Sequence, residues 1–191
     1  DADELLNEAQ AAIVEVAEQR VKPGFIPVHQ LTKPTLEMIA QFAERREAVI
    51  GIPTGFRLLD NLTSGFQRSE LIIVAARPSM GKTALCLNIS QYVGMNTDFA
   101  VGFFSMEMAK EQIIVRLLAA DSQLDIRRVR TGFVSEREFE KLKLSAEALS
   151  RARIFIDETP GLTVMEMKAK SRRLQLERSL DIVFIDYIQL M

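Results

Sequence analysis

The 191-residue chain has very few of the residues that build disulfide frameworks and metal clusters. It contains one cysteine, Cys86, and one histidine, His29. A single cysteine excludes a disulfide within the chain and a cysteine-rich zinc site, and it suits a reducing compartment. A single histidine argues against histidine-based catalytic triads and histidine-cluster metal sites. We assign no role to either residue.

The sequence also lacks an excess of one charge and a long apolar run. Its 24 Lys and Arg residues oppose 26 Asp and Glu residues, for a net charge of -2. That balance excludes a domain coated in positive charge, although a local basic groove for nucleic acid stays open. No apolar run approaches the ~18 residues of a membrane span, and the N-terminus has no signal-peptide pattern. We therefore expect a cytoplasmic protein with no membrane partner.

Two amphipathic helices are predicted in the first 47 residues. Residues 1–20 carry apolar side chains at three- and four-residue steps, and residues 32–47 repeat this pattern around Leu36 and Ile39. Residues 21–30 contain two prolines and a glycine, which is typical of a linker. Because such short helices have little core of their own, their apolar faces need a partner, either the following domain or another chain.

From Gly51 onward the pattern becomes an alternation of strands and helices. Residues 71–76 form a continuous apolar run, typical of a strand that is buried on both faces. Two pairs spaced as capping boxes, Ser135 with Glu138 and Thr163 with Glu166, open two of the helices. The alternation predicts an α/β fold with a mostly parallel sheet flanked by helices. The expected strands are 71–76, 99–105, 153–157 and 181–186, and the expected helices begin near residues 83, 108, 135 and 163.

The segment after the first of these strands is typical of a phosphate-binding loop. It ends in Gly81-Lys82-Thr83, between a buried strand and a helix, where backbone N–H groups and a helix N-terminus can cradle phosphates. We expect Lys82 to reach the β- and γ-phosphates of ATP and the Thr83 hydroxyl to bind Mg²⁺. Ala76 replaces the first glycine of the usual pattern, a small departure because that position mainly needs a compact residue. The alternative, a chance Gly-Lys-Thr on a surface turn, is disfavoured by the strand before and the helix after. The predicted nucleotide-binding residues are Ala76, Arg77, Pro78, Ser79, Met80, Gly81, Lys82, Thr83 and Ala84.

Two acidic residues follow predicted strands, and the ends of parallel strands share one sheet edge. Asp186 ends the strand 181–186 and is expected to support Mg²⁺. The alternative interpretation is an ordinary aspartate that terminates a strand. Glu107 follows the strand that ends at Ser105, and it could orient or deprotonate a water that attacks the γ-phosphate. Spacing alone fits equally well a glutamate favoured by the dipole at a helix N-terminus.

Two basic clusters give weaker indications. One consists of three arginines in a predicted loop, and the other of four cations on one predicted helix. Either could contact nucleic acid, but a solvated charged face is the favoured interpretation. The clusters are Arg127, Arg128 and Arg130, and Lys168, Lys170, Arg172 and Arg173.

Several segments together resemble the bacterial replicative DNA helicase of the DnaB type. They are GIPTGF (51–56), LD (59–60), TSGF (63–66), LIIVAARPSMGKT (71–83), FSMEM (104–108) and DYIQLM (186–191). The resemblance covers essentially the whole chain. Residues 1–20 resemble the end of that family's N-terminal helical domain, residues 21–50 its linker with a subunit-docking helix, and residues 51–191 its RecA-like ATPase domain.

This resemblance implies an ATP-dependent replicative helicase that forms a ring of six subunits. Such a ring binds ATP and Mg²⁺, moves along single-stranded DNA and unwinds duplex DNA at the replication fork, with a primase and a helicase loader as partners. It implies that Glu107 and Lys82 are catalytic and that Thr83 and Asp186 hold the metal.

The resemblance also implies that the arginine finger, the nucleotide-sensing residue and the DNA-binding loops lie beyond Met191. The ATPase domain is thus expected to be truncated after the strand that ends at Asp186, and the 191 residues alone to be poorly active. Two alternatives remain. One is another RecA-like ATPase of recombination or repair, which residues 51–66 and 186–191 disfavour. The other is a non-catalytic fragment that serves as an oligomerisation or interaction module.

Overall fold

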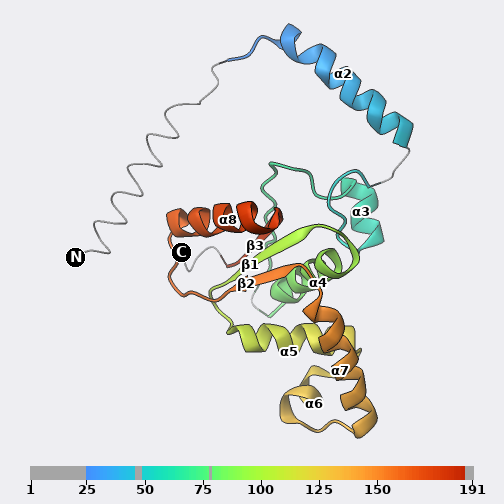
Figure 1. Ribbon diagram of the computed structural model, residues 1–191, viewed down its shortest axis with the longest axis vertical. Helices are drawn as coiled ribbons and strands as arrows, with labels where there is room; N and C mark the ends of the chain where they lie inside the picture. The colour runs from blue at the N-terminus through green and yellow to red at the C-terminus, as the bar shows by residue number, and fades with distance from the viewer. Residues whose placement is uncertain (1–24, 46–48, 78, 188–191) are drawn as a thin grey trace, which may run out of the picture. The chain divides into compact units, whose positions relative to one another are not determined.

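The computed structural model describes residues 25–45, 49–77 and 79–187. The chain divides into two units, Asp1–Glu47 and Ala48–Met191, and each is considered by itself. In the first unit, helix α2 spans Val28–Arg45 and is labelled in Figure 1. The helix predicted over residues 1–20 lies outside the described residues.

Helix α2 begins four residues before the predicted start at residue 32, so the end of the predicted linker is helical. Pro27 directly precedes the helix, and its carbonyl accepts the N–H of Gln30 at 3.0 Å. A proline at a helix start loses no hydrogen bond, and its fixed φ suits the first turn. Pro27, one of the residues that predict a linker, is therefore compatible with a helix start. The predicted apolar stripe of Leu36, Ile39 and Ala43 is exposed, with Leu36 at 66% and Ile39 at 52%.

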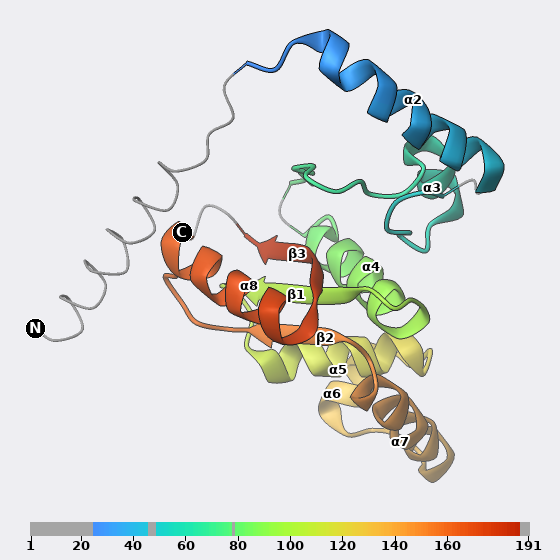
Figure 2. The ribbon, with the colours of Figure 1, turned by 45° about the horizontal axis from the view of Figure 1, so that its top comes forward.

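The second unit is built on a parallel sheet which, within the described residues, has the strand order β2-β1-β3. Phe104 of β1 pairs with Asp157 of β2, and Ser105 pairs with Asp186 of β3. The three arrows in Figure 2 point the same way, so their C-terminal ends lie at one edge. This confirms the predicted α/β class. The elements in chain order are α3 (Arg57–Thr63), α4 (Lys82–Asn96), β1 (Ala100–Ser105), α5 (Lys110–Asp121), α6 (Ile126–Thr131), α7 (Glu136–Ser150), β2 (Ile154–Asp157), α8 (Val164–Arg178) and β3 (Leu180–Asp186).

Strand β1 is the centre of the core because both of its faces are covered. Val101 and Phe103 lie among side chains of α4 and α5 on one face, including Ile89 and Leu117. Phe104 faces the other way and packs with residues at the start of α8 and just before it. In Figure 1, α8 lies on one side of the sheet and α4 and α5 lie on the other. Alternate residues of one buried strand thus join three layers, as expected for a central parallel strand.

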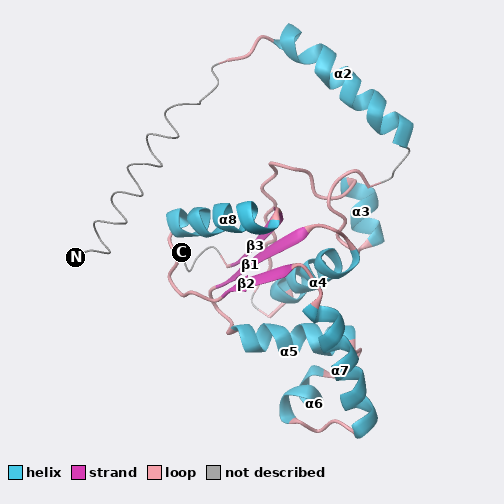
Figure 3. Cartoon of the chain, viewed as in Figure 1, coloured by secondary structure: helices cyan, strands magenta, loops and turns pink. Residues whose placement is uncertain are grey.

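The strand predicted over residues 71–76 is not formed in the structure, and this prediction is wrong. The segment is loop, as Figure 3 shows between α3 and α4, and Leu71 and Ile73 are 82% and 76% exposed. A strand needs a partner edge as well as an apolar sequence, because its backbone N–H and C=O groups must be paired. None of the described strands pairs with this run.

Two short helices were not predicted from the sequence. Helix α3 lies in the segment 51–66, where Ile52 and Phe66 also form an antiparallel bridge. Helix α6 lies where a loop was predicted for Arg127, Arg128 and Arg130, so the prediction of a loop there is wrong. Its six residues are defined by a cap at each end. The Asp125 side chain accepts the N–H of Arg127, and Gly132 ends the helix in the left-handed conformation.

Candidate functional site

The loop that leads into α4 carries the predicted phosphate-binding residues. Gly81 is the N-cap of α4 and has a left-handed backbone with φ of 92°, and Ser79 has φ of 64°. The N–H of Met80 donates to the carbonyl of Arg77 at 3.3 Å, which closes a turn. The first N–H groups of a helix have no partner within it, and they form the positive end of its dipole. The N-terminus of α4 can therefore receive an anion.

Most of the predicted nucleotide-binding residues are open to solvent. Lys82 and Thr83 are half-buried, and Pro78 lies outside the described residues. A Cβ placed on Gly81 would meet no heavy atom of the described chain within 4 Å. The described chain therefore leaves the space beside Gly81 open. The exposed members of the set are Ala76, Arg77, Ser79, Met80, Gly81 and Ala84.

Helix α4 and strand β3 bring Lys82, Thr83 and Asp186 together. The Thr83 hydroxyl donates to Oδ2 of Asp186 at 2.7 Å, and Nζ of Lys82 lies 3.9 Å from Oδ1 of Asp186. Asp186 is only 3% exposed, so its carboxylate needs these partners to offset the loss of hydration. Thr83 and Asp186, which are 103 positions apart in the sequence, thus meet at the edge where the parallel strands end.

The oxygens of Thr83 and Asp186 suit a hard cation such as Mg²⁺. Mg²⁺ is usually held by one or two protein oxygens, with water and substrate phosphates as its other ligands. The described residues include no group of three or more His, Cys, Asp or Glu that could form an all-protein metal cage. A hydroxyl and a carboxylate 2.7 Å apart, beside a loop for phosphates, fit the sparse ligand set of Mg²⁺.

Glu107 lies at the same sheet edge, just beyond the end of β1. The N–H of Met106, the residue before Glu107, donates to the Asp186 carbonyl at 2.9 Å and fixes Met106 against β3. The Ser105 hydroxyl donates to the Met108 carbonyl at 2.7 Å and stabilises the bend that contains Glu107. Glu107 is exposed, and its carboxylate makes no hydrogen bond or ion pair with the described residues. The structure places it next to the strand ends but does not join it to Lys82 or Thr83.

Sequence reasoning assigned no role to Tyr187, which the structure places in the site. Nζ of Lys82 lies over its ring, 4.3 Å from the centroid. Tyr187 directly follows Asp186, so one ammonium group contacts two successive residues at the end of β3. The position after the strand-terminating aspartate was the only indication in the sequence, and it says nothing about where the ring points.

A second feature that the sequence did not reveal is the support under α4. Oδ1 of Asp60 accepts both the N–H and the hydroxyl of Thr54, each at 2.7 Å, and both residues are buried. This network shapes the segment whose Ile52 packs against Ile89 and Val93 of α4. The segment 51–66 therefore braces the helix that presents Lys82 and Thr83.

Cys86 lies one turn further along α4. The pKa of its thiol is raised, mainly by burial and then by the negative charge of Asp186, while the positive charge of Lys82 opposes them. A raised pKa keeps the thiol neutral and unreactive. Cys86 packs against the cluster around Phe103, and it therefore acts as a small apolar side chain.

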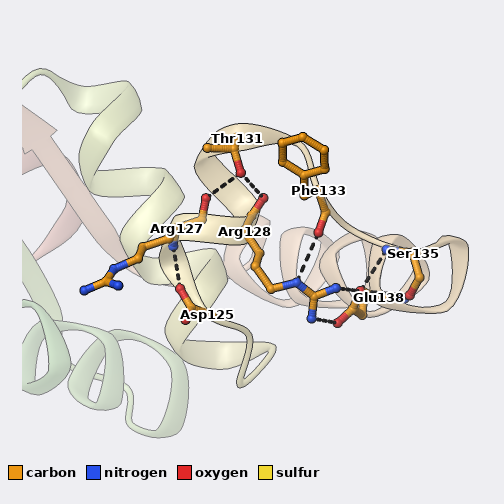
Figure 4. Close-up of polar contacts among 7 residues, drawn as sticks. All are labelled: Asp125, Arg127, Arg128, Thr131, Phe133, Ser135 and Glu138. Atoms are coloured by element: carbon orange, nitrogen blue, oxygen red, sulfur yellow. Dashed lines mark hydrogen bonds and ion pairs between the residues drawn. The ribbon is translucent and has the colours of Figure 1, made fainter.

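Each basic cluster contains at least one cation that is held in a local pair. Figure 4 shows Arg128 of α6 in a bidentate pair with Glu138, at 2.6 and 2.8 Å, while its Nε donates to the Phe133 carbonyl. The hydrogen bonds from Ser135 and the pairing with Arg128 lower the pKa of Glu138 to about 2. On α8, Lys170 donates to Asp157 at 2.7 Å. These contacts favour a structural role for Arg128 and Lys170.

Three comparisons with known proteins bear on this geometry. The family model described as "DnaB-like helicase C terminal domain" matches residues 51–191. The chain is 44% identical to the replicative DNA helicase DnaC of Bacillus subtilis (strain 168) over 190 residues, which covers 100% of the chain and 42% of that protein. It is 43% identical to the replicative DNA helicase DnaB of Geobacillus stearothermophilus, with the same coverage. The chain thus spans less than half the length of these curated relatives.

Two solved structures are similar to the chain. One, described as an ATPase domain, has a TM-score of 0.75 and 32% identity, and the match covers 83% of the chain and 57% of that structure. The other, described as a DnaB-like replicative helicase and its interactions with primase, has a TM-score of 0.73 and 28% identity, and the match covers 99% of the chain and 47% of that structure. These similarities confirm the predicted RecA-like ATPase fold. No helix in the described ranges is long and apolar enough to span a bilayer.

Proposed function

Because the chain belongs to the DnaB-like helicase family, we propose that it binds ATP with Mg²⁺ as part of a replicative DNA helicase. The whole protein would be a ring of six subunits that moves along single-stranded DNA and unwinds the duplex at the replication fork. The observation that carries this proposal is the convergence of Lys82, Thr83 and Asp186 beside the open N-terminus of α4.

Each residue of the site has a distinct role in the proposal. The ammonium of Lys82 binds the β- and γ-phosphates, whose charge also meets the N–H groups at the start of α4. The Thr83 hydroxyl and the Asp186 carboxylate hold Mg²⁺, which when bound neutralises charge on the phosphates. The carboxylate of Glu107, which is exposed at the strand ends, orients the attacking water and accepts its proton.

The partners in the proposal follow from the family. We propose that helix α2 contributes to assembly of the ring, since its Leu36 and Ile39 are exposed. A primase, a helicase loader and single-stranded DNA are the further partners, and the protein works in the cytoplasm. A helicase that is structurally similar to the chain is described together with its interactions with primase, which supports a primase as a partner.

Lys82→Ala tests the nucleotide site, and Lys143→Ala is the matched control. Lys143 is an exposed lysine of α7 that pairs with Glu140, so losing its ammonium should not affect the site. The non-hydrolysable analogue AMP-PNP with Mg²⁺ should raise the Tm of the parent and the control. A ligand at 100 times its Kd stabilises by about 2.7 kcal/mol, so the shift should be readily measured. Equal stabilisation of Lys82→Ala would refute the assignment of the phosphate loop.

A further inference from the structure

Two groups of the chain itself hold the ammonium that is assigned to the phosphates. Nζ of Lys82 is 3.9 Å from the Asp186 carboxylate and 4.3 Å from the centroid of the Tyr187 ring. The side chains of Lys82 and Asp186 are only 30% and 5% exposed, so these contacts are partly shielded from water. Lys82 is therefore engaged at the end of β3 by groups of the chain itself.

The contact with Tyr187 uses the face of the ring. A cation over an aromatic face is attracted by the ring's quadrupole, and Tyr and Phe both offer such a face while Trp offers a stronger one. The Tyr187 hydroxyl makes no hydrogen bond with the described residues, and the ring is half-buried. The interaction therefore depends on the ring and not on the hydroxyl.

We propose that Tyr187 is a positioning residue that holds Lys82 in a resting state, and that an incoming triphosphate must compete with the ring for the ammonium. This inference rests on the proposed nucleotide site. Asp186 is committed to Thr83 through its other oxygen, at 2.7 Å, so the carboxylate stays in place whether or not Lys82 moves. The ring has no second partner of this kind among the described residues, so its whole contribution is lost when the ammonium turns to a phosphate.

The consequence is that Tyr187 weakens nucleotide binding and favours release. At a partly exposed position, the loss of a cation–ring contact of this kind should change the Kd for the nucleotide by about two- to fivefold. Removing the ring should tighten binding by that factor. The opposite result is expected if the ring merely orients Lys82 toward the phosphates, because removing it would then weaken binding.

The experiment is a series at position 187 in the full chain, with the Kd for AMP-PNP and Mg²⁺ measured by calorimetry. We expect Tyr187→Leu to lower the Kd about two- to fivefold, Tyr187→Phe to leave it unchanged and Tyr187→Trp to raise it. Tyr92→Leu is the control, since Tyr92 is the other tyrosine of the chain and lies on α4 more than two turns after Lys82. An unchanged or higher Kd for Tyr187→Leu would overturn the inference.

A second measurement follows Lys82 directly. Protons of its ε-CH2 group should show an upfield ring-current shift in the ligand-free parent, lost both in Tyr187→Leu and on saturation with AMP-PNP and Mg²⁺. A shift that persists at saturation would overturn the inference, because the ring would then still hold the ammonium. If AMP-PNP binds neither the parent nor any variant, the proposed nucleotide site fails and this inference falls with it. Binding that is equal in the parent and Tyr187→Leu overturns the inference alone.

Discussion

Replacing Gly81 with alanine tests whether the loop before α4 depends on its backbone conformation. Gly81 has φ of 92° and ψ of 17°, in the left-handed region that a Cβ disfavours. The space around it is open to a distance of 4 Å within the described chain, so no clash adds to the cost. The cost is the backbone preference alone, about 1–2 kcal/mol.

Gly132 provides a matched control for this substitution. It ends α6 with φ of 74°, and a Cβ placed there also meets no described atom within 4 Å. Both alanine variants should lose about 1–2 kcal/mol of unfolding free energy, and each kcal/mol lowers the Tm of a domain of this size by roughly 2–4 °C. Thermal unfolding followed by circular dichroism measures both losses.

The two variants should differ in nucleotide binding. We expect alanine at residue 81 to relax toward negative φ, which turns the N–H groups at the start of α4 away from the proposed phosphate position. Only Gly81→Ala should therefore raise the Kd for AMP-PNP. An affinity equal to that of Gly132→Ala would refute the placement of Gly81 in the phosphate loop. A much larger loss of stability in Gly81→Ala would show that packing, and not φ, sets its cost.

Three further predictions concern Glu107, Glu138 and α2. Glu107→Gln should keep AMP-PNP affinity and lose ATP hydrolysis in the assembled ring, because an amide cannot accept the proton; turnover near the parent rate would contradict this role. The pKa of Glu138 is lowered from 4.5 to about 2, so its stabilising contribution is present above pH 4.5 and is lost as the pH falls toward 2. The unfolding free energy of the parent should thus fall more steeply over that window than that of Glu138→Gln. Equal slopes would refute the stabilising role of the contacts that Glu138 makes with Arg128 and Ser135 in Figure 4. Leu36→Asp with Ile39→Asp should weaken the ring, measured by light scattering, more than it lowers the Tm; an unchanged oligomer would exclude these side chains from the subunit contact.

Local features of the fold could be predicted from the sequence, because they depend on residues close together in the chain. Both capping boxes form as expected, since Ser135 and Thr163 each bond a glutamate three residues later. The segment 71–76 was mispredicted because the apolar pattern does not say which edge will pair with it. Helix α6 was missed because six residues are too few for a periodic pattern, and only its caps define it.

The candidate site likewise has features that the sequence predicts and features that depend on the folded structure. The meeting of Thr83 and Asp186 follows from one rule, that parallel strands end at a shared edge, and the structure brings them within 2.7 Å. The position of the Tyr187 ring over Lys82 depends on side-chain rotamers, which no spacing in the sequence encodes. The hydrogen bonds between Thr54 and Asp60 depend on burial in the folded state, so they too could not be predicted from the sequence.

The Met106–Asp186 backbone hydrogen bond gives the two halves of the site unequal local stability. It extends the ladder of β1 and β3 past the strand ends, so Glu107 and Asp186 are carried by one hydrogen-bonded frame. Lys82 and Thr83 are carried by the first turn of α4, where the N–H groups have no helical partner and the preceding loop is exposed. Amide hydrogens of β1 should therefore exchange with solvent only when the whole unit opens, while those at the start of α4 exchange through small local fluctuations. The start of α4, which would rearrange around a nucleotide, thus lies at the less protected end of the gradient. Glu107 and Asp186, which the proposal assigns to the water and the metal, lie at the more protected end.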